Sequence, residues 1–288
     1  DSNKQLIENL QQKKTSEDGQ VGGINFTVTG ANGFNRTIAT DSNGEWKIEG
    51  INPGTYTVTE ESINKYVPQN SQTVTVEGGN KTATVTFSNV LKKFRVSVNK
   101  QDIEKTHPQG DAKLGGAIYG LYHGDTLVAQ YTTQNDGTFT TDYFVCDTNW
   151  NLKEIQPSEG YLLDETVYQV GADPQLYTVE YNWTSNTVKE QVKKGKVSII
   201  KHTDDGSTKI ETPEKGAEFQ LYLKSSGSFG NADPDERDTI ICDEDGFASS
   251  KLLPYGVYTV HQTKGWMVER KLLILMFLFN QIMLLINS

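Results

Sequence analysis

The chain has 288 residues, with 27 Lys and Arg against 37 Asp and Glu, and its formal net charge is −10. A nucleic-acid surface normally shows a basic excess, so this composition argues against DNA or RNA as a partner. The two cysteines and the four dispersed histidines form no disulfide scaffold and no local zinc motif. We therefore expect no metal and no cofactor, and the length predicts two or three domains.

Three stretches of the sequence repeat the same four features in the same order. Each has a lysine, then a strand with Gly at its first and an aromatic residue at its fourth position, then a polar turn ending in Gly, and then an aromatic-led strand. The lysines are Lys14, Lys100 and Lys201; the Gly-led strands are 23–28, 116–121 and 216–221; the turns are 41–44, 134–137 and 243–246; the aromatic-led strands are 56–60, 150–154 and 258–262. Such repetition predicts similar domains in series.

Apolar and polar residues alternate along these stretches, and helical spacing is nearly absent. Alternation with period two predicts strands with one inward and one outward face, and Asp-Gly and Asn-Gly pairs supply tight hairpin turns. We therefore predict an all-β chain of tandem Ig-like β-sandwiches. The expected divisions are a linker or fragment start at 1–13, sandwiches at 14–91, 93–192 and 195–270, and an apolar tail at 271–288.

The tail differs in composition from the rest of the chain. Between Leu272 and Ile286, 13 of 15 residues are apolar, and all three methionines lie in the last 22 positions. A membrane span needs about 20 apolar residues, so this stretch is short for one. Two interpretations stay open, a membrane anchor at 272–286 or a segment from a shifted reading frame. In either case we expect the third sandwich to be incomplete, because the tail begins where its closing strand should be.

The motifs G-A-x-F-x-L, P-G-x-Y-T-V-T-E and a closing F-x-N resemble those of the Cna B-type repeat, the SpaA-type prealbumin-like domain of Gram-positive surface adhesins and pilins. The resemblance covers residues 14 to 270. It implies an intramolecular isopeptide bond between a lysine of the first strand and an Asn or Asp of the last strand, assisted by a Glu. In the first repeat it assigns Lys14 as nucleophile, Glu60 as proton shuttle and Asn89 as acceptor. Lys13 is a rival nucleophile on the opposite face.

Physical chemistry gives this implied reaction a reason. An exposed lysine is protonated at pH 7 and cannot attack a carbonyl group. Burial disfavours the charged form of both groups, so it lowers the pKa of a lysine and raises that of a neighbouring glutamate. The neutral amine is then a nucleophile, and the carboxylic acid can polarise the acceptor carbonyl group.

The later repeats depart from this pattern. In the second, Lys100 and Glu154 fit, but the acceptor position holds Glu190, and Asn182 or Asn186 would need a change of register. Lys100 and Glu190 are therefore a possible second site, with Glu154 as a weaker candidate for the proton shuttle. In the third repeat the Glu position is Gln262, which cannot act as an acid. We expect no bond there.

The resemblance implies a stalk module of a cell-wall adhesin or pilin, extracellular on a Gram-positive bacterium. Its expected partners are the neighbouring domains of the same protein, and membrane contact depends on the 272–286 anchor. The alternative is an adhesive module for a host matrix protein or glycan, with loop aromatics such as Trp183 and Trp266 in the binding site. No GxSxG, Walker loop or HExxH is present, so we expect no turnover enzyme. We expect Cys146 and Cys242 to be unpaired.

Overall fold

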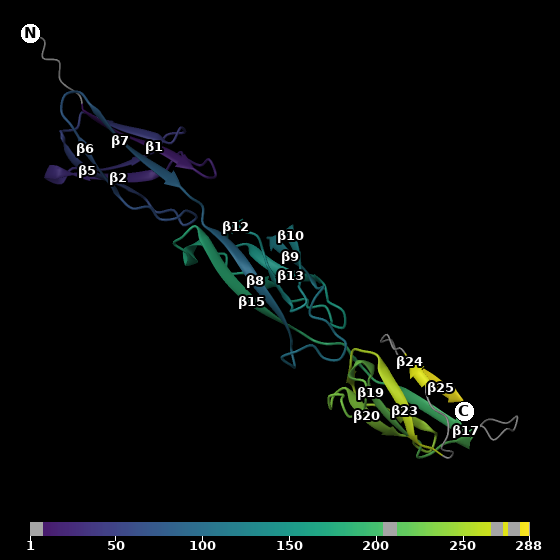
Figure 1. Ribbon diagram of the computed structural model, residues 1–288. Helices are drawn as coiled ribbons and strands as arrows, with labels where there is room; N and C mark the ends of the chain where they lie inside the picture. The colour runs from purple at the N-terminus through teal and green to yellow at the C-terminus, as the bar shows by residue number, and fades with distance from the viewer. Residues whose placement is uncertain (1–7, 204–211, 266–272, 276–282, 288) are drawn as a thin grey trace, which may run out of the picture. The chain divides into compact units, whose positions relative to one another are not determined.

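The computed structural model describes residues 8–203, 212–265, 273–275 and 283–287. These residues form β-strands and three short 3₁₀ turns, at Ala31–Gly33, Pro174–Leu176 and Lys224–Ser226 (Figure 1). The prediction of an all-β chain is confirmed.

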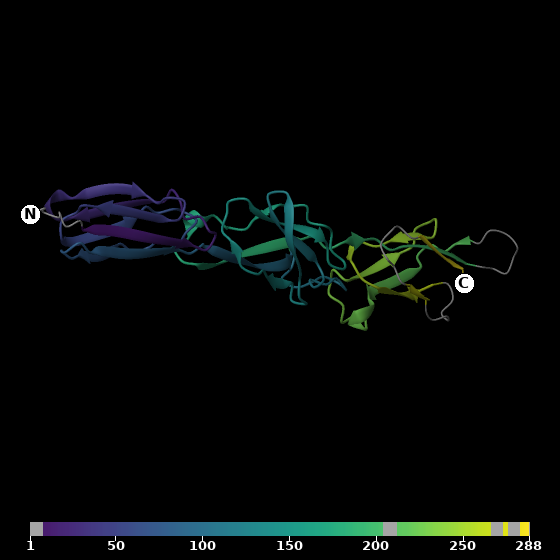
Figure 2. The same cartoon turned by 90° about the horizontal axis from the view of Figure 1, so that it is seen from above.

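The first sandwich consists of two facing sheets (Figure 2). One sheet has the order β4-β1-β7 and the other has the order β3-β2-β5-β6. The strands are β1 (Asn9–Ser16), β2 (Asn25–Gly30), β3 (Asn35–Ala39), β4 (Glu45–Glu49), β5 (Gly54–Glu60), β6 (Gln72–Val76) and β7 (Thr82–Asn89). β1 and β7 run parallel, so the first and last strands of this sandwich are hydrogen-bonded neighbours.

The second sandwich repeats this arrangement with different strand lengths. One sheet has the order β10-β9-β13-β14, and the other has the order β11-β8-β12 with β15 also paired to β8. The strands are β8 (Lys93–Asp102), β9 (Ile118–His123), β10 (Thr126–Thr132), β11 (Thr138–Thr140), β12 (Phe144–Val145), β13 (Trp150–Gln156), β14 (Tyr168–Gln169) and β15 (Tyr181–Glu190). The lysine-bearing strand β8 is therefore again paired with the last strand of its sandwich.

The third sandwich has sheets β18-β17-β21, with β25 on β17, and β20-β19-β23-β24, while β16 pairs with β22. The strands are β16 (Lys194–Gly195), β17 (Ser198–Thr203), β18 (Thr212–Pro213), β19 (Glu218–Leu223), β20 (Arg237–Ile241), β21 (Phe247–Ser249), β22 (Leu253–Pro254), β23 (Tyr258–Lys264), β24 (Leu273–Leu275) and β25 (Met283–Asn287).

Two expectations about the chain ends differ from the structure. β1 begins at Asn9, inside the stretch 1–13 that we expected to be a linker, because Leu10 alternates with polar neighbours and is fully buried. The third sandwich has a closing strand, since β25 lies parallel to β17 as β7 does to β1.

Residues 271, 272, 276–282 and 288 of the predicted tail lie outside the described part. Within the described residues, no helix is long and apolar enough to cross a membrane.

Alternation of inward and outward side chains decides which lysines are buried. Along β8 the side chains of Val96, Val98 and Lys100 point inward in turn. Along β1 the inward positions include Leu10 and Lys14. Because the period is two, each of these lysines is carried into the sandwich by the same alternation that buries its apolar neighbours.

The fold divides into two compact units. The first contains Asp1–Val96, Thr141–Trp150 and Gln169–Thr184, and the second contains Ser97–Thr140, Asn151–Tyr168 and Ser185–Ser288. Both units draw on the second sandwich. The domain boundaries expected from the sequence therefore stay a prediction.

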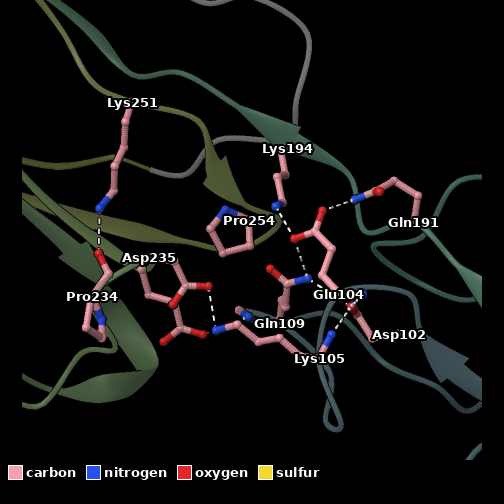
Figure 3. A network of polar contacts seen from close by, with 12 residues as sticks. Asp102, Glu104, Lys105, Gln109, Gln191, Lys194, Pro234, Asp235, Lys251 and Pro254 are labelled. Carbon is pink, nitrogen blue, oxygen red and sulfur yellow. Dashed lines mark hydrogen bonds and ion pairs between the residues drawn. The ribbon is translucent and has the colours of Figure 1, made fainter.

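Within the second unit, the loop that follows β8 contacts strands and turns of the third sandwich (Figure 3). The backbone N–H of Gly110 donates to the Glu236 carboxylate at 2.8 Å, and Lys105 Nζ lies 2.6 Å from Asp235 Oδ2. The backbone N–H of Asp111 donates to the Tyr255 carbonyl oxygen at 2.8 Å. The loop is thus held by backbone groups as well as by surface charges.

Gly110 is a position of this loop with no room for a side chain. Its φ is +60°, and an added Cβ would lie 2.2 Å from the Tyr255 carbonyl oxygen. We expect Gly110→Ala to separate the loop from the third sandwich, with the N–H groups of Asp111 and Val257 exchanging at least about tenfold faster, equivalent to about 1.4 kcal/mol. Hydrogen exchange measures this, with Gly124→Ala, also at φ +60° but with open space around it, as the control. Unchanged exchange at both N–H groups would contradict the prediction.

Candidate functional site

Lys14 is buried on the inward face of β1. Its side chain is 0% exposed, and its Nζ lies 5.9 Å and 6.0 Å from the ring centroids of Phe26 and Phe87. Burial lowers the pKa of Lys14 from its ordinary value, and the neighbouring Glu60 acts in the opposite direction. The rival Lys13 points to the other face, where its side chain is 58% exposed and lies 3.5 Å from Glu45. The structure therefore leaves Lys14 as the buried amine of this strand.

Glu60 and Asn89 lie at the same end of the sandwich as this amine. Lys14 Nζ donates to Glu60 Oε2 at 2.6 Å, and the Glu60 side chain is 7% exposed. The side-chain N–H groups of Gln69 donate both to Glu60 Oε2 at 3.0 Å and to Asn89 Oδ1 at 2.6 Å. Gln69 thus links the two groups that the sequence pattern assigned. Sequence reasoning missed it, because it lies in a loop before β6 that carries no repeated motif.

The parallel pairing of β1 and β7 brings Asn89 toward the lysine. Ser16 is the partner of Asn89 in register, two residues beyond Lys14, so the side chains of Lys14 and Ser16 share one face. Asn89 is 1% exposed, and its Nδ2 is buried without a hydrogen-bond partner among the described residues. A small pocket beside it is lined by Glu60, Tyr66, Pro68, Gln69 and Asn89 among others.

In the second sandwich the three assigned side chains are in contact. Lys100 on β8, Glu154 on β13 and Glu190 at the end of β15 are all 0% exposed at the side chain. Lys100 Nζ forms an ion-pair contact with Glu190 Oε2 and lies 3.6 Å from Glu154 Oε1. Tyr119 donates its hydroxyl hydrogen to Glu190 Oε1. The residue that departs from the family pattern is therefore the one that lies against the lysine.

Burial dominates the acid–base properties of this cluster. It lowers the pKa of Lys100 to about 8, although the Glu154 carboxylate acts in the opposite direction. Burial also raises the pKa of Glu154, opposed by the backbone N–H of Asp164, which donates to Glu154 Oε2 at 2.8 Å, and by Lys100. The pKa of Tyr119 is raised by burial as well, so its hydroxyl group stays a hydrogen-bond donor. Burial therefore favours the neutral forms of both Lys100 and Glu154.

The asparagines considered for this site lie elsewhere. Asn182 donates through Nδ2 to the carbonyl oxygens of Lys93 and Val179, both at 2.9 Å. Asn186 precedes Glu190 by four positions on β15, which is about 13 Å along a strand. With Glu190 beside the amine, neither asparagine is the partner of Lys100 in this register.

The third sandwich also buries its lysine, but with a different carboxylate. The Lys201 side chain is 5% exposed, and its Nζ lies 3.5 Å from Glu214 Oε2. Gln262 donates to the Lys264 carbonyl oxygen instead. Lys201 is the register partner of Ile286, as Lys14 is of Phe87, so the position equivalent to Asn89 is Ser288. That residue and Trp266 lie outside the described part of the chain.

Cys146 and Cys242 are buried and free. Among the residues that the structure describes, no group of three or more His, Cys, Asp and Glu side chains could hold a metal ion.

Comparison with known proteins agrees with this architecture. The family model of the SpaA prealbumin-like fold domain matches residues 8–91 and 97–187. The chain belongs to this family. The first SpaA segment contains Lys14, Glu60 and Asn89, whereas Glu190 lies three residues beyond the second. No curated protein matches the sequence.

A solved structure shares the fold of this chain at low sequence identity. The Bacillus anthracis TIE protein superposes with a TM-score of 0.72 at 21% identity, covering 98% of this chain and 50% of that chain. This chain therefore spans about half the length of that relative. BcpA, the major pilin subunit of Bacillus cereus, gives a TM-score of 0.49 at 13% identity and covers 98% and 99% of the two chains. The likeness to the TIE protein concerns the fold.

The hydroxyl group of Tyr119 offers a test of the second cluster. Tyr119→Phe would leave a buried carboxyl oxygen of Glu190 without its donor, and we expect a loss of about 1–3 kcal/mol in unfolding free energy. Hydrogen exchange of the second-sandwich amides during urea unfolding measures it. The control is Tyr122→Phe on the same strand, whose ring is only half-buried, with an expected change below about 0.5 kcal/mol. Equal effects of the two substitutions would argue against a special role for the Tyr119 hydroxyl.

Proposed function

We propose that this chain is a structural stalk module of a Gram-positive cell-surface adhesin or pilin, cross-linked inside its first sandwich by an amide bond between Lys14 and Asn89. The observation that carries the proposal is the buried Lys14–Glu60 pair, which Gln69 links to Asn89. Its partners are the neighbouring domains of the same surface protein. The matched family is defined by a fold domain rather than by an enzymatic activity, and the bond forms once in each molecule.

The first reaction exchanges one amide for another. Glu60 takes a proton from Lys14, and the neutral amine attacks the side-chain carbonyl carbon of Asn89. The carbon–nitrogen bond to Nδ2 breaks, Glu60 returns the proton to that nitrogen, and ammonia leaves. Burial supports this sequence, because it lowers the pKa of the amine. Departure of ammonia is favoured by the adjacent pocket and by the lack of a hydrogen-bond partner for the leaving nitrogen Nδ2 among the described residues.

A second bond between Lys100 and Glu190 is supported by the contact between these two side chains. Here the acceptor is a carboxylic acid, which is an electrophile only when protonated. The amine attacks the carboxyl carbon, an oxygen leaves as water, and an amide forms. The hydroxyl group of Tyr119 donates to the other carboxyl oxygen and polarises the carbonyl bond. Glu154, with its raised pKa, serves as the proton shuttle.

Such bonds suit a module that bears load. In the first sandwich, β1 and β7 are the two strands through which tension would enter and leave, and they are parallel neighbours. A bond between Lys14 and Asn89 closes a loop of about 76 residues, which by analogy with a disulfide would stabilise the fold by about 4 kcal/mol. Tension between the ends of the sandwich would then pass through a covalent bond instead of the backbone hydrogen bonds.

Intact mass distinguishes the two bonds. We expect the folded chain to be lighter than its sequence mass by about 35 Da, from one ammonia of about 17 Da and one water of about 18 Da. Glu60→Ala should retain only the loss of water, and Glu154→Ala only the loss of ammonia, because each removes one proton shuttle. Lys13→Ala is the control and should leave the full loss in place.

Acceptor substitutions test the chemistry of each bond. Asn89→Asp should replace the loss of ammonia in the first sandwich by a loss of water, and Glu190→Gln should make the opposite change in the second. Asn89→Asp should thus increase the total mass deficit by about 1 Da, and Glu190→Gln should decrease it by about 1 Da. A folded wild-type chain with its full sequence mass would refute both bonds. A mass deficit of only about 17 Da would refute the Lys100–Glu190 bond, and a deficit of only about 18 Da would refute the Lys14–Asn89 bond.

The lowered pKa of Lys100 predicts an unusual pH dependence. In the folded chain the Lys100 amine is half neutral at a pH of about 8, whereas a lysine at its ordinary pKa of 10.5 would be half neutral only above pH 10. In a Glu60→Ala background, the rate of water loss after a freshly synthesised, denatured chain is folded should therefore rise from about pH 6 and stop rising above about pH 9. A rate that still rises at pH 10 would contradict the shifted pKa.

A further inference from the structure

The outward face of the second sandwich carries three exposed aromatic side chains in the first unit. Tyr143, Tyr181 and Trp183 are 39%, 55% and 58% exposed, and the rings of Tyr143 and Tyr181 lie 4.8 Å apart. Tyr181 and Trp183 are outward positions of β15, on either side of the buried Asn182. Tyr143 lies in the loop that directly precedes β12. Two of the three aromatic rings are therefore displayed by a strand.

A positive charge lies among these rings. The guanidinium group of Arg95, on β8, lies 3.7 Å from the ring centroid of Trp183 and 4.9 Å from that of Tyr143. Its Nε is buried and has no hydrogen-bond partner, and no carboxylate among the described residues forms a salt bridge with it. The neighbouring Lys93, in contrast, contacts both Glu17 and Glu180. In a chain of net charge −10, Arg95 is thus a cation without a carboxylate partner in the part of the chain that the structure describes.

The fold does not require this chemistry. In the first sandwich, the closing strand β7 occupies the place of β15, and its outward side chains are Thr82, Thr84, Thr86 and Ser88. Thr82 precedes the acceptor position Asn89 by as many residues as Trp183 precedes Glu190, so the two positions are equivalent. The same structural position therefore holds a small polar residue in one sandwich and a large exposed indole in the other. We call Arg95, Tyr143, Tyr181 and Trp183 the aromatic patch.

We infer that the aromatic patch is a binding site for a carboxylated glycan. The faces of Tyr181 and Trp183 can stack on the apolar faces of sugar rings, and the Arg95 guanidinium can pair with a sugar carboxylate in bidentate geometry. A ligand carboxylate at the Nη atoms of Arg95 would supply the carboxylate partner that the described residues do not provide, and this is the charge complementarity of the patch. The patch lies on the outer face of the sheet, whereas a bound peptide strand would pair with the backbone at a sheet edge. This inference is independent of the proposed cross-links, which lie inside the sandwiches.

The test uses a hyaluronan tetrasaccharide, which carries a carboxylate on alternate sugars, and its carboxyl methyl ester as a neutral probe of equal size. Binding to the full chain is followed by tryptophan fluorescence and calorimetry. We expect the acidic probe to bind at least about tenfold more tightly than the ester, and Arg95→Gln to remove that preference. Trp183→Thr, which copies the first sandwich, should weaken the binding of both probes at least about tenfold.

Control variants separate the patch from general charge effects. Lys47→Gln, on the outward face of β4 in the first sandwich, removes one positive charge elsewhere and should leave binding unchanged. Hydrogen exchange of the second-sandwich amides shows whether each variant keeps its fold, so loss of binding is distinguished from misfolding. Equal affinity for the acid and its ester, or binding that Arg95→Gln and Trp183→Thr leave intact, would overturn the inference. Absence of binding to the acidic probe, or preference for an acidic peptide over it, would overturn it as well.

Discussion

The structure depends on the burial of a lysine inside each sandwich. A buried ammonium group costs several kcal/mol unless it is paired or becomes neutral. Lys14, Lys100 and Lys201 each lie within 4 Å of a glutamate, at distances of 2.6 Å to Glu60, 3.6 Å to Glu154 and 3.5 Å to Glu214. Each pair removes part of that cost. A condensation would remove the rest, because an amide carries no charge.

The parallel pairing of first and last strands makes that condensation geometrically reasonable. Residues 73 positions apart in the sequence are register partners on neighbouring strands of one sheet in the first sandwich, with Ser16 opposite Asn89. The third sandwich uses the same pairing between β17 and β25. In both sandwiches, parallel pairing therefore places the last strand beside the strand that carries the buried lysine.

The inside and the outside of the sandwiches differ in what the fold demands. Inward positions carry lysine, glutamate and aromatic side chains in comparable places in the first two sandwiches. The outward positions of the closing strands differ, with threonines on β7 and aromatic residues on β15. Strand pairing constrains the inward residues through packing, whereas the outward residues are free to acquire a separate binding role.

The sequence by itself determined the all-β class and the repetition, because alternation with a period of two is a local property of the chain. Its resemblance to the Cna B-type repeat also pointed to Lys14, Glu60, Asn89, Lys100, Glu154 and Glu190, with Lys13 as a rival that the structure then placed on the exposed face. Only the tertiary structure decided that Gln69 bridges Glu60 and Asn89, that Tyr119 binds Glu190 and that Glu214 accompanies Lys201. It also decided that the apolar tail supplies β25, where we expected no strand. These contacts join side chains from strands and loops that are distant in the sequence. The alternation of residues along one strand cannot predict them, because it does not specify which distant side chains meet across a sheet or between two sheets.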